Sequence, residues 1–334
     1  MIYAQDGREA RSRLFLHIGM NKTGSSAIQR WLASNSENLA VAGVLYPLAG
    51  RRGDAHYGFS QALGFAHGRR VPEQVELAAL RDGLLHELSQ RPTGNVVLSS
   101  EDFVLGGDPD VVRDFLGEFD VRVVVYLRRH DHWWLSVYNK AVKMVVEPPW
   151  ESGIQAYLAF CRSQRNLPGR YRALVDRWAA VFGADRVIVR PFEQAQNPGG
   201  VASDFLRTIG QEELALEAAR SPERVNAALG AETLHVLDLL QRAELDSATR
   251  EMLTQRLLVA GAGEAPANLM RPRLRRRLID ENLGDYEYIA RRYLGRDDGV
   301  LFQEPIPEPD EPWEAPGQPS RARLVTLIAR LMAQ

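Results

Sequence analysis

The sequence predicts an α/β fold, in which a central, mostly parallel sheet of about five strands is followed by a helical C-terminal half. Five short runs rich in β-branched and aliphatic residues have the length and composition of buried strands, namely Arg13–Gly19, Gly43–Leu48, Asn95–Ser100, Val121–Leu127 and Arg186–Phe192. Segments with helical periodicity separate these runs. Strands that alternate with helices form βαβ units, so we expect three layers, with helices on both faces of the sheet.

The predicted helices carry apolar residues at helical spacing. In the part of the chain that contains the predicted strands, the clearest predicted helices are Ser25–Ser34, Val75–Leu88 and Tyr171–Phe182. After Pro198 the chain is mainly helical, and its clearest segments are Ala202–Ile209, Ala231–Ala243 and Leu274–Leu294. We expect a single domain over residues 13–300.

The C-terminal region differs in composition from the rest of the chain. Phe302–Pro319 contains six prolines and several acidic residues, which exclude a regular helix and predict a linker over residues 301–319. In the next segment, Ser320–Gln334, four apolar side chains share one helical face: Leu324, Leu327, Ile328 and Leu331. We expect this amphipathic helix, residues 320–334, to dock on its own domain. A homodimer contact is the main alternative, and binding to a membrane surface is a weaker one.

Composition excludes several classes of protein. The 334 residues include 41 Lys plus Arg and 43 Asp plus Glu, a net charge of −2 that argues against a general nucleic-acid binder. The single cysteine, Cys161, excludes an intramolecular disulfide and a cysteine-cluster metal site. Residues 1–13 lack the apolar core of a signal peptide, and no apolar run approaches the roughly 20 residues of a membrane span. We therefore expect a cytoplasmic protein without a membrane span.

The segment Leu14–Gln29 carries the strongest functional signal. An apolar strand runs into a short glycine-containing loop and then into an amphipathic helix. This arrangement directs backbone N–H groups and the helix dipole at the loop, which favours a phosphate-like anion. Lys22 adds a full positive charge, and hydroxyl donors follow at Thr23, Ser25 and Ser26.

The order of these residues differs from that of an ATP- or GTP-binding Walker A loop. Gly19 and Gly24 have the Walker A separation, but Ser25 occupies the lysine position and Lys22 lies two residues before Gly24. The series Lys-Thr-Gly-Ser-Ser after the first strand instead resembles the 5′-phosphosulfate loop of sulfotransferases that use 3′-phosphoadenosine 5′-phosphosulfate (PAPS). Asn21 stands where that family commonly has proline.

A second segment resembles the same family. In these sulfotransferases a strand ends in arginine, and a serine eight residues later helps it to hold the 3′-phosphate of the cofactor. Arg128 and Ser136 have this spacing after the predicted strand Val121–Leu127, and Arg129 is the competing assignment. The planar guanidinium of arginine suits a phosphate group.

The resemblance, to the bacterial type of this family, covers roughly residues 13–300 and implies a P-loop-NTPase-like fold for that domain. It implies transfer of a sulfuryl group from PAPS to an acceptor hydroxyl, with adenosine 3′,5′-bisphosphate (PAP) as product and without a metal. The acceptor would be a carbohydrate, a glycolipid or a small metabolite. Lys22 would stabilise charge near the bridging oxygen, Ser25 and Ser26 would hold the 5′-phosphate, and Thr23 and Gly24 would shape the turn.

The acceptor hydroxyl needs a general base. Glu101 follows the strand Asn95–Ser100, in the region where family members carry their catalytic His or Glu. We therefore expect Glu101 to be the base. The alternative is that Glu101 is a helix N-cap or first-turn acid of the following segment, a role that Asp102 could serve equally well. His56, in the polar loop Arg51–Tyr57, is the alternative base or a substrate contact.

Two other functions stay open at the level of sequence. One is a P-loop kinase-like phosphotransferase, and the other is a non-catalytic, sulfotransferase-like binding protein. The adenine contact is unassigned, and Arg224 is a possible counterpart of the family's late basic loop.

Overall fold

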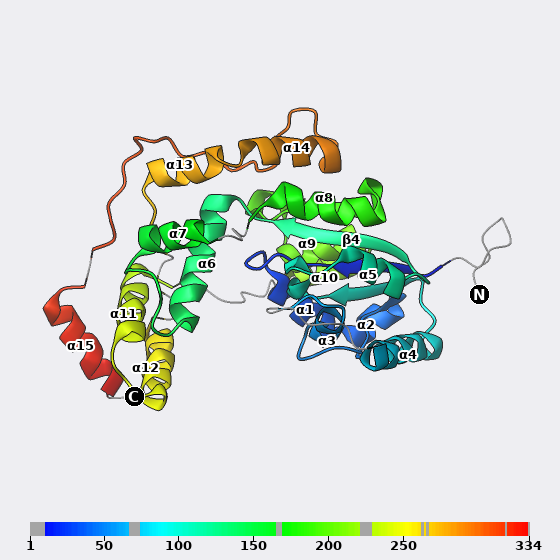
Figure 1. Ribbon diagram of the computed structural model, residues 1–334, viewed down its shortest axis with the longest axis horizontal. Coiled ribbons are helices and arrows are strands. Elements are labelled where there is room, and N and C mark those ends of the chain that lie inside the picture. Colours follow the sequence, from blue (N-terminus) through cyan, green and yellow to red (C-terminus); the bar gives the residue numbers. More distant parts are fainter. Residues whose placement is uncertain are drawn as a thin grey trace. The chain divides into compact units, whose positions relative to one another are not determined.

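The computed structural model describes residues 11–66, 74–164, 169–220, 229–261, 264, 267–317 and 319–332, and Arg224 lies outside these ranges. The chain forms two compact units, each built from three segments (Figure 1). The first comprises Met1–Arg128, Arg170–Val225 and Gly284–Glu304, and the second comprises Arg129–Gly169, Asn226–Leu283 and Pro305–Gln334. That residues 13–300 act as one sulfotransferase domain stays a prediction.

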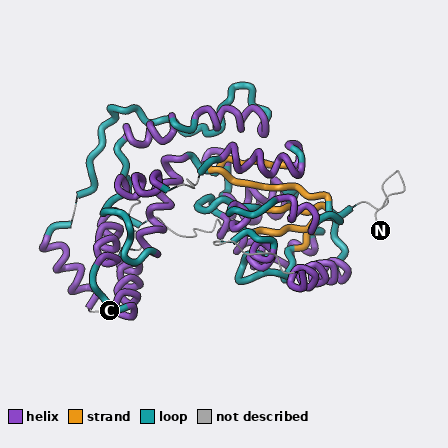
Figure 2. Tube along the Cα trace, in the orientation of Figure 1, coloured by secondary structure: helices purple, strands orange, loops and turns teal. Residues whose placement is uncertain are grey.

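The first unit contains a sheet of five parallel strands in the order β2-β3-β1-β4-β5. The strands, orange in Figure 2, are β1 (Arg13–His17), β2 (Val44–Leu45), β3 (Asn95–Ser99), β4 (Asp120–Leu127) and β5 (Val187–Pro191). The predicted α/β class is confirmed. β1 pairs with both β3 and β4, so the loop that follows β1 lies at the middle of the carboxyl edge of the sheet.

Helices surround this sheet in the first unit. They are α1 (Ser25–Ser34), α2 (Ser36–Val41), α3 (Tyr57–Ala62), α4 (Gln74–Gln90), α5 (Pro109–Phe115), α8 (Tyr171–Phe182), α9 (Val201–Thr208), α10 (Glu212–Arg220) and most of α14 (Leu283–Leu294). Three short 3₁₀ helices are η1 (Glu101–Val104), η2 (Ala184–Arg186) and η3 (Gln194–Gln196).

The two faces of the sheet are covered by different helices because side chains alternate along each strand. On one face, Val124 and Tyr126 of β4 join a buried apolar cluster with α1, α9 and α10. On the other face α8 packs along β4 and β5 (Figure 1). There the fully buried Trp178 stacks on Phe65, with ring centroids 5.8 Å apart, and meets the edge of Phe103 at 6.1 Å. The expected three layers are present.

The second unit is helical in the residues that the structure describes. It contains α6 (His130–Met144), α7 (Ile154–Ser163), α11 (Ala231–Arg242), α12 (Ser247–Ala260), α13 (Pro272–Asp280) and α15 (Arg321–Met332). α6 packs against α7, α11 and α13. The C-terminal segment forms α15, which packs against α12 and is tied to α11 by an ion pair of 2.8 Å between Arg323 and Glu232. A homodimer contact through α15 stays a prediction.

The predicted helix Leu274–Leu294 is interrupted. The chain leaves α13 at Asp280, and the side-chain amide of Asn282 donates a hydrogen bond of 2.8 Å to the Leu278 carbonyl. This contact satisfies a carbonyl at the helix end, and a new helix, α14, starts at Leu283. In the described part of the chain, no helix is both long and apolar enough to cross a bilayer.

The Trp178→Ala variant tests the packing of α8 on the sheet. Removal of this fully buried ring is expected to lower the free energy of unfolding by about 3–5 kcal/mol, because the site loses both transferred apolar area and ring contacts. Urea denaturation followed by circular dichroism measures the change. The Val41→Ala variant, at a position 91% exposed, is the control and should change stability by less than about 0.5 kcal/mol. An equal loss in both variants would contradict this description of the core.

Candidate functional site

The loop between β1 and α1 turns through residues in the left-handed region. Gly19, Lys22 and Gly24 have φ values of 55°, 68° and 81°. Gly24 is the N-cap of α1, and no side chain caps this helix. A Cβ at Gly24 would lie 2.7 Å from Cγ1 of Val201 and 2.9 Å from Cε2 of Phe192, so the position requires glycine. The loop therefore leaves the N-terminal end of α1 without a side-chain cap, which is the geometry of an anion site.

The hydroxyl groups of this segment have different environments. Thr23 is fully buried, and its Oγ1 donates a hydrogen bond of 2.6 Å to the Met20 carbonyl inside the loop. Ser25 is also buried, with Oγ 3.4 Å from the same carbonyl, whereas Ser26 is exposed on the first turn of α1. Thr23 thus stabilises the turn, and Ser26 is the hydroxyl that faces solvent. Direct contact of Ser25 and Ser26 with a 5′-phosphate stays a prediction.

Arg128 lies beside this loop. It directly follows β4, and its Nη1 donates a hydrogen bond of 3.1 Å to the Lys22 carbonyl. Its guanidinium carbon lies 5.4 Å from the centroid of the Phe192 ring, and its own carbonyl accepts a hydrogen bond of 2.6 Å from the Tyr171 hydroxyl. The structure therefore brings two cationic residues, Lys22 and Arg128, to neighbouring strand ends.

Arg129 has a different role. It belongs to the second unit, is buried, and donates from two nitrogens to the Asp131 carboxylate at 2.9 and 3.1 Å. Its Nη1 donates to the Pro305 carbonyl at 3.1 Å. Because this buried ion pair occupies the guanidinium fork, the arrangement favours Arg128 over Arg129 as a phosphate ligand. Ser136 is half-buried on α6 in the second unit, and its pairing with Arg128 stays a prediction.

Glu101 packs against the loop that follows β1. It begins η1, one residue beyond the end of β3, and a Cβ added to Gly19 would lie 3.0 Å from the Cα of Glu101. One carboxylate oxygen accepts a hydrogen bond of 2.8 Å from the Tyr57 hydroxyl, and the other accepts one of 2.9 Å from the Gln29 side-chain amide. Burial, followed by the charge of Glu101, raises the pKa of Tyr57, so the phenol stays protonated and remains a donor. Gln29 and Tyr57 thus fix the orientation of this carboxylate.

These hydrogen bonds continue into the core. The Gln29 amide also donates to Ser99 Oγ at 3.2 Å, and Ser99 Oγ lies 2.8 Å from Nδ1 of the fully buried His17. Burial lowers the pKa of His17 to about 4, although Glu101 opposes the shift. The histidine is therefore neutral at pH 7. Sequence reasoning missed Gln29 and Tyr57, and the one available signal was a glutamine on the apolar face of α1.

His56 lies inside the protein rather than in a solvated loop. It is fully buried, its Nδ1 accepts a hydrogen bond of 3.1 Å from the Ser99 backbone N–H, and its Nε2 is 2.9 Å from the Pro47 carbonyl. Burial lowers its pKa to about 4. With both ring nitrogens bound to backbone, His56 holds the loop after β2 against β3. This arrangement favours Glu101 over His56 as a base.

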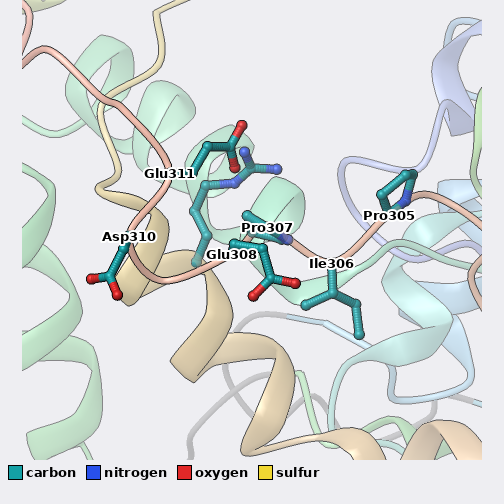
Figure 3. A pocket seen from close by; sticks show the side chains of 7 residues that line it. Pro305, Ile306, Pro307, Glu308, Asp310 and Glu311 are labelled. Carbon is teal, nitrogen blue, oxygen red and sulfur yellow. The ribbon is translucent and has the colours of Figure 1, made fainter.

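Other features of the described residues do not add to this site. A cavity of about 690 Å³ in the second unit is lined by Arg275 and by the proline-rich segment from Pro305 to Glu311 (Figure 3). Arg275 is ion-paired with the buried Asp131, and none of the candidate site residues lines the cavity. Within the described ranges, no three His, Cys, Asp or Glu side chains gather as a metal-binding group.

The two buried histidines predict a pH dependence of stability. The pKa of His56 is about 4 in the folded protein and 6.5 as its ordinary value, so the unfolded chain binds the proton more tightly. Its contribution to stability is complete above pH 6.5 and is lost as the pH falls toward 4, by about 2 kcal/mol between pH 7 and 5. The His56→Gln variant should be less stable than the wild type at pH 7, and its deficit should shrink by that amount at pH 5. Urea denaturation at both pH values measures it.

The exposed His86 on α4 provides the control for this experiment. The His86→Gln variant should keep the pH dependence of the wild type. A deficit in His56→Gln that is the same at pH 7 and pH 5 would show that His56 is not buried in its neutral form.

Comparisons with known proteins give structural likenesses only. No family model matches the sequence, and no curated protein matches it. Among solved structures, the chain is similar to a sulfotransferase from Alicyclobacillus acidocaldarius, with 19% identity and a TM-score of 0.42 over 75% of this chain and 93% of that chain. It is also similar to mouse sulfotransferase SULT7A1 complexed with PAP, with 14% identity and a TM-score of 0.36 over 81% of this chain and 89% of that chain. Values this low do not establish a function, so the function proposed below rests on the residues of this chain.

Proposed function

We propose that this protein is a PAPS-dependent sulfotransferase, which moves a sulfuryl group from PAPS to a hydroxyl of a carbohydrate, a glycolipid or a small metabolite. One observation carries the proposal. Three features meet at one edge of the sheet. Lys22 lies in a left-handed loop at the N-terminus of a helix that no side chain caps. Arg128 donates a hydrogen bond to that loop, and Glu101 packs against it.

The 5′-phosphosulfate would bind at the N-terminal end of α1. Backbone N–H groups of the first turn and the helix dipole favour an anion there, and Ser26 adds an exposed hydroxyl. Lys22, on the left-handed part of the loop, would stabilise the negative charge that develops on the bridging oxygen as the sulfuryl group leaves. Thr23 and Gly24 maintain the turn through the contacts described above.

The 3′-phosphate would bind to Arg128, with Ser136 as its partner. The hydrogen bond to the Lys22 carbonyl and the Phe192 ring orient the guanidinium before any ligand arrives. An oriented guanidinium binds phosphate through parallel charged hydrogen bonds, each worth about 1.5–3 kcal/mol. This contact would distinguish PAPS and PAP from nucleotides without a 3′-phosphate.

Glu101 would remove the proton from the acceptor hydroxyl. A carboxylate has about four lone-pair sites, and Tyr57 and Gln29 occupy one on each oxygen, which leaves sites for the acceptor. The acceptor oxygen then forms a bond to sulfur while the bond from sulfur to the bridging phosphate oxygen breaks in line with it. The hydroxyl proton passes to Glu101, and the bridging oxygen leaves with its electron pair as part of PAP.

Nucleotide binding tests the phosphate sites. We expect PAP to bind more tightly than AMP or ATP, and Arg128→Ala to weaken PAP binding by about 10- to 100-fold, which corresponds to one lost charged hydrogen-bond contact. AMP binding should change much less in this variant, because AMP lacks the 3′-phosphate. Isothermal titration calorimetry measures each affinity.

Arg122 provides a matched control, because it lies on the same strand, away from the loop, and contacts Asp120 and the Asp185 carbonyl. The Arg122→Ala variant should bind PAP like the wild type. ATP binding equal to or stronger than PAP binding would favour a kinase-like phosphotransferase, and the absence of nucleotide binding would favour a non-catalytic binding protein. Either result would overturn the proposal.

The role of Glu101 predicts a separation between binding and turnover. Glu101→Gln should keep the affinity for PAP and lower kcat by about 10²- to 10⁴-fold, because the amide can accept a hydrogen bond but cannot take the proton. Transfer of radiolabelled sulfate from PAPS to a hydroxyl acceptor of the wild type measures kcat.

Asp102, the next residue of η1, is the control for charge at this position. Asp102→Asn should keep kcat within a few-fold of the wild type. Equal losses in both variants would contradict the assignment of the base to Glu101.

A further inference from the structure

The loop between β2 and α3, residues 46–56, carries an arginine that the proposed mechanism does not use. Nη1 of Arg51 is buried and has no hydrogen-bond partner in the described structure, and the guanidinium carbon lies 5.7 Å from the centroid of the Tyr46 ring. The neighbouring Arg52 is exposed and donates a hydrogen bond of 2.6 Å to the Gln61 side chain. A buried charged donor without an acceptor is rare, because its desolvation is not compensated, so it indicates a position that a ligand completes.

Hydrogen bonds at both ends hold this loop in one conformation. The Tyr46 hydroxyl donates to the Asp54 carbonyl at 2.6 Å, and the His56 ring connects the Pro47 carbonyl to the backbone of Ser99. The Glu87 carboxylate accepts hydrogen bonds of 2.8 and 2.7 Å from the backbone N–H groups of residues 48 and 49.

Gly50 fixes the backbone directly before Arg51. It has a φ of 67°, and a Cβ there would lie 2.5 Å from the Phe59 ring. The backbone that presents Arg51 is therefore already ordered, which lowers the entropy cost of binding through this side chain.

The order of the strands places this loop next to Glu101 and on the side away from the nucleotide site. Along the carboxyl edge, the segments that follow β2, β3, β1 and β4 contain Arg51, Glu101, Lys22 and Arg128 in that order. Tyr57, the first residue of α3 after this loop, donates a hydrogen bond to Glu101. Burial raises the pKa of Tyr46, and the charges of Arg51 and Glu101 act on this phenol in opposite directions. The loop that contains Arg51 thus follows β2, on the other side of β3 and Glu101 from β1 and β4, which carry Lys22 and Arg128.

We propose that Arg51 binds an oxyanion carried by the acceptor, so that the preferred acceptors are hydroxyl compounds with a carboxylate or a phosphate group. This inference rests on the proposed function and names the acceptor class of the same site. A guanidinium offers a planar pair of donors that matches the oxygens of a carboxylate or a phosphate, and it is weakly hydrated enough to pair in a partly buried position.

The test compares acceptors that share a scaffold and differ in whether they carry an anionic group. The protein is saturated with PAP, and calorimetry measures the binding of p-nitrophenyl glucuronide, p-nitrophenyl glucoside and the 6-phosphate of that glucoside. A second pair is 4-hydroxyphenylacetate and its amide. For at least one of these two sets of compounds, we expect an anionic compound to bind at least about tenfold more tightly than the neutral compound of the same set. A carboxylate preference and a phosphate preference distinguish the two kinds of oxyanion.

Substitutions then assign the preference to Arg51. Arg51→Gln should reduce the ratio of charged to neutral affinities to near one, and it should leave the binding of the neutral compound and of PAP unchanged. Arg51→Lys, which keeps the charge without the fork, should retain part of the preference. Arg52→Gln is the matched control and should keep the wild-type ratio.

The failure of this inference differs from the failure of the proposed function. Wild-type protein that binds PAP but prefers the charged compound on neither scaffold overturns the role of Arg51 alone. A preference that survives undiminished in Arg51→Gln also overturns it. Absence of PAP binding instead contradicts the sulfotransferase proposal, and with it this inference.

Discussion

The parallel arrangement of five strands is the constraint on which the candidate site depends. Because every strand runs in the same direction, the loops that follow β1, β2, β3 and β4 all emerge at one edge of the sheet. Lys22, Glu101 and Arg128 are far apart in the sequence, but the loops that carry them meet at this edge. β1 lies at the centre, so its loop has Glu101 on one side and Arg128 on the other.

A second layer of hydrogen bonds maintains the geometry of that edge. Among the described residues, the side-chain donors to the Glu101 carboxylate are the neutral groups of Tyr57 and Gln29. A cationic partner would favour the ionised form of a carboxylate and so make it a weaker proton acceptor. Neutral donors orient the carboxylate without that effect, which suits a general base. Beneath them, the buried and neutral His17 and His56 connect the ends of β1, β2 and β3.

The sequence predicts the parts of this structure that depend on local patterns. The α/β class, the β1 to α1 loop with Lys22, and the position of Arg128 at a strand end follow from periodicity and motif spacing. The roles of Arg129 and His56 could not be predicted, because they depend on packing. Arg129 forms a buried ion pair with Asp131. The ring of His56 is bound by the Pro47 carbonyl and the Ser99 backbone N–H. The same holds for the break between α13 and α14, where the Asn282 side-chain amide donates a hydrogen bond to the carbonyl of Leu278 at the helix end.

The most direct test of the central claim is a crystal structure of the protein grown with PAP. The 5′-phosphate should lie at the N-terminal end of α1, within hydrogen-bond distance of the backbone N–H groups of Ser25 and Ser26 and of the Lys22 ammonium group. The 3′-phosphate should contact the Arg128 guanidinium. A nucleotide bound elsewhere, or bound with neither phosphate on Lys22 or Arg128, would contradict the proposed sulfotransferase site.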